Sequence, residues 1–527
     1  MGNQIFVALT FATLILRTDG FAAQNCAAIR YDWTLEDVFA RTAFADDIGN
    51  WYVAGAFYEP HDFDPTVSLD VRSPATPEFA DLFISKLQYD GTYVWTFSVG
   101  GAKNEEVFGI ATDDHGNVFI AGGFQDTVDF DPGPGVDQHT SVFFYNAFLT
   151  KLRHDGSYLR TRAFEGYDFV SARGVAVDRH DNVVVVGGSA TAVIVKLTND
   201  GDYLWNRTIA GGAWVTAYEV AVDANDDIIV FGQFRGTVDF DPGPGLDRRT
   251  AMSQPVPIDL FVTKYQSDGT YVWTHTYPAG PASSKSLALQ SDGSIFLAGG
   301  IGQSTDLDPT AGVDLREGPA IFVTKLNSDG SYGRTYSAGF NFGGFHAIAV
   351  TSGGDVLALG STYPGEDPDF DPSKETMTIP CEGRGSCHFL FCLDPKGKPK
   401  WVKGTQDNQG TSLTMTLSDA GEVYYSTAFV FETTFDTDMT CGVDQRSIGF
   451  DTFLGLTKLR CIDSTGDSDS DGDVDLLDLA AFQNCFEGSD SDTCSPGCDA
   501  FDLHSDNRLD LLDYSILPPS ITGPLGQ

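Results

Sequence analysis

Residues 116–123 read Gly-Asn-Val-Phe-Ile-Ala-Gly-Gly, and residues 148–156 read Phe-Leu-Thr-Lys-Leu-Arg-His-Asp-Gly. The first stretch is a tight turn followed by an apolar run. The second is an apolar run that ends in an Asp-Gly pair, which is a strong hairpin signal. Both patterns recur along the chain, so they indicate a repeated unit of short β-strands.

The repeat can be followed through most of the 527 residues. The turn occurs at Gly49-Asn50, Gly116-Asn117, Asp181-Asn182, Asp226-Asp227, Gly293-Ser294, Gly354-Asp355 and Gly421-Glu422. The hairpin glycines stand at 91, 156, 201, 269, 330 and 397, so the spacing is 61 to 68 residues except for one interval of 45. A Tyr-x-Trp strand then follows at Tyr93–Trp95, Tyr203–Trp205 and Tyr271–Trp273. These signals predict seven units of four strands each.

Four short strands cannot bury both of their faces alone, whereas sheets arranged in a ring bury them against their neighbours. In these motifs the chain resembles the seven-bladed β-propeller repeat proteins that bacteria secrete. The resemblance covers about residues 30–460 and implies an all-β propeller of seven four-stranded blades over residues 24–460. The fixed place of Trp95, Trp205, Trp273 and Trp401 in the repeat favours packing between blades over a sugar-binding platform.

The two ends of the repeat suggest how the ring closes. The seventh unit stops after its third strand, at Lys458-Leu459, and the missing Tyr-x-Trp strand stands at the start of the chain as Tyr31-Asp32-Trp33. We therefore expect the N-terminal strand to complete the last blade. Cys26 and Cys461 flank this seam and are candidates for a disulfide.

Six units carry an acidic loop between the second and third strands. The copies begin at Asp62, Asp129, Asp239, Asp306 and Asp369, and Thr434-Phe435-Asp436 is a decayed one. In the clearest copy, Asp129 and Asp131 stand two residues apart, Pro132 follows directly, and Asp137 stands six residues after Asp131. Such loops either chelate calcium or are turns whose aspartates bond to their own backbone. The spacing lacks the central glycine of an EF-hand loop, which favours the turn.

A different acidic pattern lies near the C-terminus. Residues 467–478 place carboxylates at positions 1, 3, 5, 9 and 12 of an EF-hand-like loop, with Gly472 at position 6. These ligands are Asp467, Asp469, Asp471, Asp475 and Asp478, and Asp473 at position 7 would supply its backbone carbonyl. A second copy has Asp502, Asp506, Asp510 and Asp513 at positions 1, 5, 9 and 12 and Arg508 at position 7. His504 at position 3 weakens the prediction of a calcium site there.

Aspartate at position 12 and an apolar residue at position 8, Val474, make the first loop resemble a type I dockerin more than a helix-loop-helix sensor. The resemblance implies a small α-helical calcium-binding domain over residues 463–520 and a cohesin-like protein module as its partner. The paired leucines at 476–477 and 511–512 stand where dockerins present partner contacts, and they are equally candidates for the core of the small domain.

Composition bears on compartment and partners. The net charge is −42, which disfavours nucleic acid and anionic membranes as partners. Residues 5–16 are apolar but too few to span a bilayer, and residues 1–22 read as a secretory signal peptide, with a buried N-terminal strand as the alternative. Nine cysteines without paired Cys-x-x-Cys spacing fit a secreted protein better than a zinc ribbon.

No catalytic motif is recognisable: the sequence has no Gly-x-Ser-x-Gly, no His-Glu-x-x-His and no phosphate-binding loop. His115, His154 and His180 lie in or beside turns and are expected to be solvated. Two functions remain open. One is a secreted, non-catalytic propeller that binds a polysaccharide or a cell-surface ligand and is tethered by its tail. The other is an extracellular polysaccharide-degrading enzyme, because such enzymes often carry dockerins and need only two carboxylates.

Overall fold

The fold is all-β in the part of the chain that the structure, a computed structural model, describes. The described residues run from 25 to 462, except for 37, 47, 65–67, 89–90, 143, 165, 167–168, 254–255, 281–284, 340–342, 363–368, 372–376, 380–386, 406–409, 418–422, 431–433, 437–444 and 448–451. Within these ranges the chain forms strands and no helix. The expected signal peptide and the dockerin-like domain lie outside the described residues. The described part also contains no helix that is long and apolar enough to cross a membrane.

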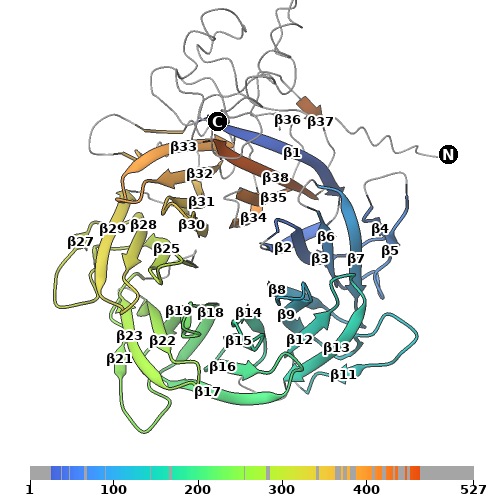
Figure 1. Cartoon of the computed structure of the whole chain (residues 1–527), viewed down its shortest axis with the longest axis horizontal. Helices are drawn as coiled ribbons and strands as arrows, with labels where there is room; N and C mark the ends of the chain where they lie inside the picture. The colour runs from blue at the N-terminus through green and yellow to red at the C-terminus, as the bar shows by residue number, and fades with distance from the viewer. Residues whose placement is uncertain are drawn as a thin grey trace, which may run out of the picture.

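The strands form antiparallel sheets arranged in a ring (Figure 1). From the innermost strand outward, the sheets of the first half are β2 (Val38–Ala45), β3 (Trp51–Phe57), β6 (Asp81–Leu87), β7 (Tyr93–Val99); β8 (Glu105–Thr112), β9 (Val118–Phe124), β12 (Asn146–Leu152), β13 (Tyr158–Phe164); and β14 (Ala172–Val177), β15 (Val183–Gly188), β16 (Ala192–Leu197), β17 (Tyr203–Gly211).

The second half of the ring repeats the same order. Its sheets are β18 (Trp214–Val222), β19 (Ile228–Arg235), β22 (Ile258–Tyr265), β23 (Tyr271–Tyr277); β24 (Lys285–Leu289), β25 (Ile295–Ile301), β28 (Ala320–Leu326), β29 (Tyr332–Gly339); β30 (Gly343–Val350), β31 (Val356–Thr362), β32 (Cys387–Leu393), β33 (Pro399–Thr405); and β34 (Gly410–Leu417), β35 (Val423–Val430), β38 (Thr452–Ile462), β1 (Asn25–Glu36).

Short two-stranded ribbons form the acidic loops at the outer edge of the ring (Figure 1). They are β4 (His61–Asp62) with β5 (Val71–Arg72), β10 (Thr127–Asp129) with β11 (Gln138–Thr140), β20 (Thr237–Asp239) with β21 (Arg248–Thr250), β26 (Thr305–Asp306) with β27 (Leu315–Arg316), and β36 (Thr434–Asp436) with β37 (Gln445–Ser447). Each ribbon lies between the second and third strands of its unit, as the repeat predicted.

The expected pattern of seven four-stranded blades holds for six sheets only. The remaining sheet has six strands, in the order β14-β15-β16-β17-β20-β21. Its outer strand β17 runs on to Gly211 and pairs with the acidic ribbon of the following unit, through Ala210 opposite Asp239 and Gly211 opposite Val238. The missing acidic loop of this unit is not the cause, because the same contact recurs as a bridge between Gly101 and Val128, where the first unit has an acidic loop of its own.

The first and last strands of the described chain lie in the same sheet, whose order is β1-β38-β35-β34. The register places Tyr31 opposite Leu456 and Cys26 opposite Cys461. The N-terminal strand therefore supplies the outermost strand of the sheet that the C-terminal unit leaves incomplete. Pairing of the two ends in one sheet removes two exposed strand edges.

Where burial is described, the second and third strands of the sheets are almost entirely buried on both faces. All seven residues of β9 and all seven of β12 are buried, because neighbouring sheets cover them from both sides. One core cluster joins Ile84 and Phe97 of one sheet to Val107 and Phe124 of the next. Such strands read as continuous apolar runs rather than alternating ones.

Three buried lysines each tie their own sheet to the next one. Lys196 of β16 pairs with Asp178 at 2.7 Å within its own blade, and their side chains are 2% and 0% exposed. Its Nζ also donates to the carbonyl oxygen of Ser267 (3.2 Å) in the hairpin of the following sheet. Lys151 and Lys264 repeat this arrangement with Asp113 and Asp223 and with the carbonyls of Asn199 and Ser328.

The tryptophans of the outer strands complete these contacts. Trp95 Nε1 donates to the carbonyl of His154 (3.2 Å), and Trp205 Nε1 donates to that of Ser267 (3.0 Å). A Cβ at Gly156, which has a φ of +82°, would lie only 2.5 Å from the ring of Trp95. The hairpin glycine thus meets two demands, a left-handed backbone and close approach of an indole. This geometry supports the packing role expected for the tryptophans.

We expect Lys196→Met to lower stability by about 3 kcal/mol, because it leaves the buried Asp178 carboxylate without its cation. The matched control is Lys325→Met: in that unit Gln290 replaces the aspartate of the turn, and Lys325 is only half-buried. Calorimetric melting of the full chain measures both. Equal shifts for the two variants would contradict the role of the buried pair.

The register at the seam predicts a disulfide between Cys26 and Cys461. Residues directly opposite in an antiparallel pair have Cα atoms about 4.5–5.5 Å apart, which is within the range that a disulfide spans. Mass spectrometry of a non-reducing digest of secreted protein should find the two peptides joined. Reduction, or Cys26→Ser, should lower the melting temperature, and recovery of both cysteines as free thiols would disprove the bond.

Candidate functional site

The candidate calcium ligands of the tail, from Asp467 to Asp513, all lie outside the described residues. The structure therefore places none of them, and they remain predictions from the sequence. The described part offers three other polar groupings: the acidic loops, a pair of His-Asp groups in the inner turns, and two buried acids between the first two blades.

The acidic loops share one hydrogen-bonding pattern. In the second unit, Oδ1 of Asp129 accepts from the backbone N–H of Asp131 (3.2 Å) and of Asp137 (2.8 Å). The first aspartate of the other loops, Asp62, Asp239, Asp306 and Asp369, accepts the same two backbone hydrogen bonds. These carboxylates therefore close the loop on itself, as an Asx turn does.

The residue between the two aspartates anchors the loop to the core. Phe130 is fully buried and packs against Phe124 and Phe148, with ring centroids 5.3 and 5.0 Å away. The last aspartate of the loop, Asp137, accepts a hydrogen bond from the hydroxyl of Tyr158 on the outer strand. In the first unit, burial alone would raise the pKa of the equivalent Asp70, but hydrogen bonds from Arg72 and Tyr93 hold that pKa below its usual value.

This arrangement explains the Asp-x-Asp-Pro motif as a clasp. One aspartate shapes the turn, one aromatic residue enters the core, and the last aspartate holds the tyrosine of the Tyr-x-Trp strand. The geometry supports the turn interpretation over the calcium one, because backbone amides already occupy Oδ1 of the first aspartate in all five loops.

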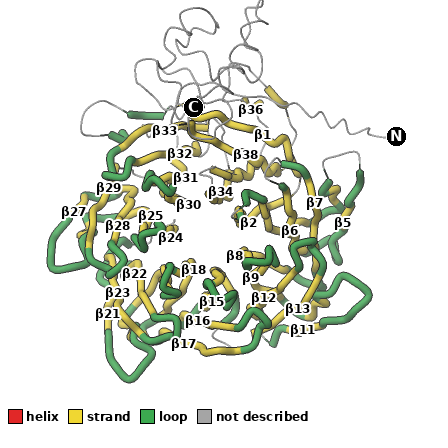
Figure 2. The backbone as a smooth tube through the Cα atoms, viewed as in Figure 1, coloured by secondary structure: helices red, strands yellow, loops and turns green. Residues whose placement is uncertain are grey.

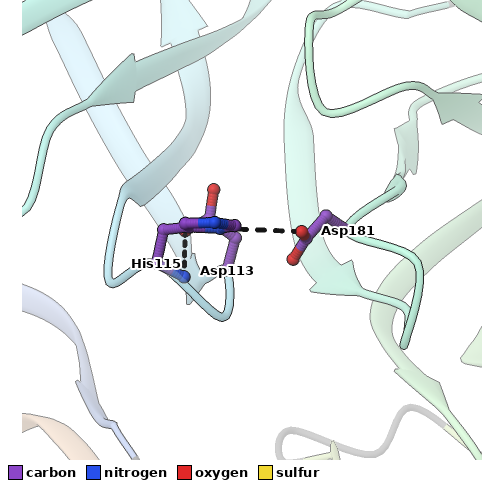
Figure 3. Close-up of side chains that lie close together, drawn as sticks. All are labelled: Asp113, His115 and Asp181. Carbon is purple, nitrogen blue, oxygen red and sulfur yellow. Dashed lines mark hydrogen bonds and ion pairs between the residues drawn. The ribbon is translucent and has the colours of Figure 1, made fainter.

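A second grouping lies in the turns between the two innermost strands (Figure 3). Asp113, His115 and Asp181 place one ligand atom each within 4.8 Å of one another, and Asp178, His180 and Asp226 do the same one blade further on. His115 Nδ1 lies 3.7 Å from Asp181, which belongs to the turn of the neighbouring blade. Both histidines are mostly exposed, in keeping with their predicted solvation, but each also contacts an aspartate of the next blade.

The two aspartates that contact a histidine of the neighbouring blade share an unusual backbone conformation. Asp181 and Asp226 have φ values of 59° and 62°, at a turn position that is glycine in the other five units. A non-glycine residue in this region is uncommon and costs free energy. Aspartate tolerates it better than most residues, and here it adds a contact between blades.

The same geometry disfavours a bound metal. Asp113 Oδ1 accepts from the backbone N–H of His115 and Asn117, at 3.0 and 2.8 Å. Its Oδ2 accepts from Asn199 Nδ2 (2.9 Å) and lies 3.3 Å from Lys151 Nζ. A metal ion would have to displace a buried lysine, so we interpret both groups as ion pairs between blades.

The third grouping consists of two buried acids near the junction of the first two blades. Burial raises the pKa of Glu105 to about 9, and a hydrogen bond from the backbone N–H of Gly101 only partly opposes this. Burial likewise raises the pKa of Asp81 to about 6. Glu105 is therefore protonated at neutral pH, and it adds no charge to this part of the core.

None of these groupings combines a nucleophile, a base and a group that orients it. Among the described histidines, His275 Nε2 donates to the carbonyl of Gly330 (2.8 Å), and His346 Nε2 lies 2.7 Å from Ser361 Oγ. Burial lowers the pKa of both imidazoles, so both are neutral at physiological pH.

The sequence interpretation missed one set of residues, those at β-bulges in the innermost strands. They stand five residues before the first residue of the inner turn in six units and vary from unit to unit: Arg41, Phe108, Arg173, Tyr218 and His346 are bulged, whereas Lys285 is paired opposite Gly299. The signal was a variable position inside an otherwise regular repeat. This variable position can be interpreted only once the fold has placed the innermost strands side by side.

If the acidic loops are clasps, replacing both Asp129 and Asp131 by Ala should cost about 1–2 kcal/mol, which is the value of a few lost hydrogen bonds. Phe130→Ala should cost more, about 3–5 kcal/mol, since it empties a buried aromatic site. The free energy of unfolding in urea measures both. For a chain truncated after residue 462, a melting temperature that falls with chelator and recovers with calcium would refute the clasp.

Comparison with known proteins adds little beyond the fold. No family model matches the chain. A stretch of 108 residues, 20% of the chain, is 32% identical to an uncharacterized WD repeat-containing protein of Acanthamoeba polyphaga mimivirus, and it spans only 8% of that relative.

Three solved structures are similar at low sequence identity. The WD40 domain of Neurospora crassa Pan2 is 10% identical with a TM-score of 0.37, over 79% of this chain and 88% of that one. The Dos1 propeller is 9% identical with a TM-score of 0.38, over 80% and 95%. A Bacteroides caccae protein of unknown function is 11% identical with a TM-score of 0.29, over 62% and 94%. The assignment as a β-propeller therefore rests on the strand order of the chain itself.

Proposed function

We propose that this chain is a secreted, non-catalytic β-propeller that binds a ligand and is tethered through a calcium-loaded, dockerin-like tail to a cohesin-like module. In this proposal β14–β17 form one of seven blades, extended by the ribbon β20–β21. One observation carries the non-catalytic part. The polar residues that recur in the blades, namely the strand lysines, the turn aspartates and the loop aspartates, are engaged in bonds within and between blades.

The tether rests on the sequence of the tail. Alternating carboxylates with a glycine at position 6 suit calcium, which prefers six to eight oxygen ligands. The aspartates of the propeller loops lack this spacing and close on their own backbone instead. The chain thus contains two kinds of aspartate-rich loop, and only the tail kind has the ligand spacing that wraps an ion.

We expect the full chain to take up calcium in titration calorimetry and to lose its tightest site in the variant Asp467→Ala/Asp471→Ala. The matched control is Asp129→Ala/Asp131→Ala, which removes two aspartates of a propeller loop and should leave calcium uptake unchanged. Binding to a recombinant cohesin module should require calcium, because metal binding and folding of such loops are coupled.

Two results would contradict the proposal. Calcium uptake that survives in the tail variant and disappears in the loop variant would move the metal to the propeller. Release of reducing sugar from a panel of polysaccharides by the full chain would favour the polysaccharide-degrading enzyme instead.

A further inference from the structure

A β-bulge interrupts the innermost strand of most sheets at the same place. The register shifts between Ala40 and Thr42, Val107 and Gly109, Ala172 and Gly174, Ala217 and Glu219, and Phe345 and Ala347. The extra residues are Arg41, Phe108, Arg173, Tyr218 and His346, and Lys285 holds the equivalent position in the fifth unit. We call these six residues the axial bulge ring, since their strands surround the centre of the ring (Figure 2).

A bulge leaves one residue out of the ladder and re-aims its side chain. Positions that hold the propeller together keep one residue type in most units, whereas this position alternates between cationic and aromatic residues in six units and is Leu413 in the seventh. Three of the six are lysine or arginine, in a chain that has only 32 such residues and a net charge of −42. None of the six is acidic.

Arg173 is the member of the axial bulge ring with the best-defined surroundings. Its guanidinium carbon lies 5.2 Å from the ring centre of Phe108 in the preceding blade and 5.3 Å from that of Tyr218 in the following blade. Two aromatic faces from neighbouring bulges therefore hold the guanidinium, and such contacts fix its plane without using its N–H donors.

The donors of Arg173 have no acceptor. Other arginines pair with carboxylates, as Arg72 does with Asp70 and Arg316 with Asp314. Over the described ranges, Arg173 makes no hydrogen bond or ion pair, and its Nε is buried without a partner. A buried donor without a partner costs free energy, and a ligand that supplies an acceptor recovers it.

We propose that the axial bulge ring is a binding site for a ligand that carries one carboxylate, with Arg173 as the anchoring residue. The planar, fixed guanidinium matches the two oxygens of a carboxylate in a bidentate pair. The inference rests on the proposed ligand-binding role of the propeller and names the chemistry of its ligand.

Neighbouring acids favour a ligand with a single negative charge. Glu106 is two residues before Phe108 and pairs with Arg41 at 3.3 Å. Glu219 follows Tyr218 and accepts from the backbone N–H of Leu287. These carboxylates flank both aromatic partners of Arg173, so a dianion such as sulfate would meet repulsion on both sides.

The test uses D-galacturonate and D-galactose, which differ at C6 by the carboxylate alone. Titration calorimetry of the full chain, with calcium withheld, should show binding of galacturonate and none of galactose. Arg173→Met should weaken binding at least tenfold, and Arg173→Lys should also weaken it, because an ammonium group cannot form the bidentate pair.

The control is Arg207→Met. Arg207 also lies over an aromatic ring, that of Trp205 at 5.2 Å, but its guanidinium already donates to the carbonyls of Gly269 and Asp268.

The melting temperatures of all variants show whether each one folds, and Arg173→Lys keeps the test decisive should Arg173→Met be unfolded. No galacturonate binding by the wild type, equal binding of galactose, binding of sulfate in preference to galacturonate, or unchanged affinity in a folded Arg173 variant would each overturn the inference. Calcium uptake is then measured on the same preparation. It shows whether the tail binds calcium, so a failure of the proposed tether can be told apart from a failure of the proposed carboxylate site.

Discussion

The ring depends on a buried lysine that belongs to two blades at once. Lys196 neutralises an aspartate in its own blade and donates to a hairpin carbonyl of the next, and Lys151 and Lys264 do the same. An unpaired ammonium group at such a depth would cost much free energy. The turn aspartate, the strand lysine and the hairpin carbonyl must therefore lie within bonding distance of one another. This requirement explains why the motifs for these three elements are fixed together in the sequence.

The acidic loops show how aspartates can be abundant without forming metal sites. In each of the five described propeller loops the first carboxylate accepts two backbone N–H groups, and in four of them the last carboxylate accepts from a tyrosine hydroxyl. Backbone N–H groups therefore occupy Oδ1 of the first carboxylate in each of these loops. The first tail loop differs in having a glycine at position 6 and carboxylates at alternating positions, a spacing that predicts oxygens converging on an ion. Spacing, and not acidity, separates the two kinds of loop.

Much of the fold followed from local patterns in the sequence. The turn, hairpin and Tyr-x-Trp signals predicted four-stranded units, and the split between Tyr31 and Lys458 pointed to the sheet that joins the two ends. The six-stranded sheet was not predictable, because the pairing of Gly211 with Val238 joins the outer strand of one unit to the acidic ribbon of the next. The contact between His115 and Asp181 was missed for a similar reason: the two residues are near each other only when adjacent blades are in place.

A repeat protein divides its residues into two classes. Positions that recur unchanged are those that every blade needs, and in this chain the lysines, loop aspartates and hairpin glycines have structural partners that account for them. Specific recognition then has to come from positions that the fold leaves free to vary. The bulges of the innermost strands meet this condition, because a bulged residue lies outside the ladder and its identity does not affect strand pairing. Neighbouring blades bring those residues together, so that Phe108 and Tyr218 hold an arginine that no single blade could orient. The regular part of the repeat thus fixes the geometry of the irregular part, and an unpaired guanidinium at that point of a strongly acidic chain is the group best suited to select a ligand.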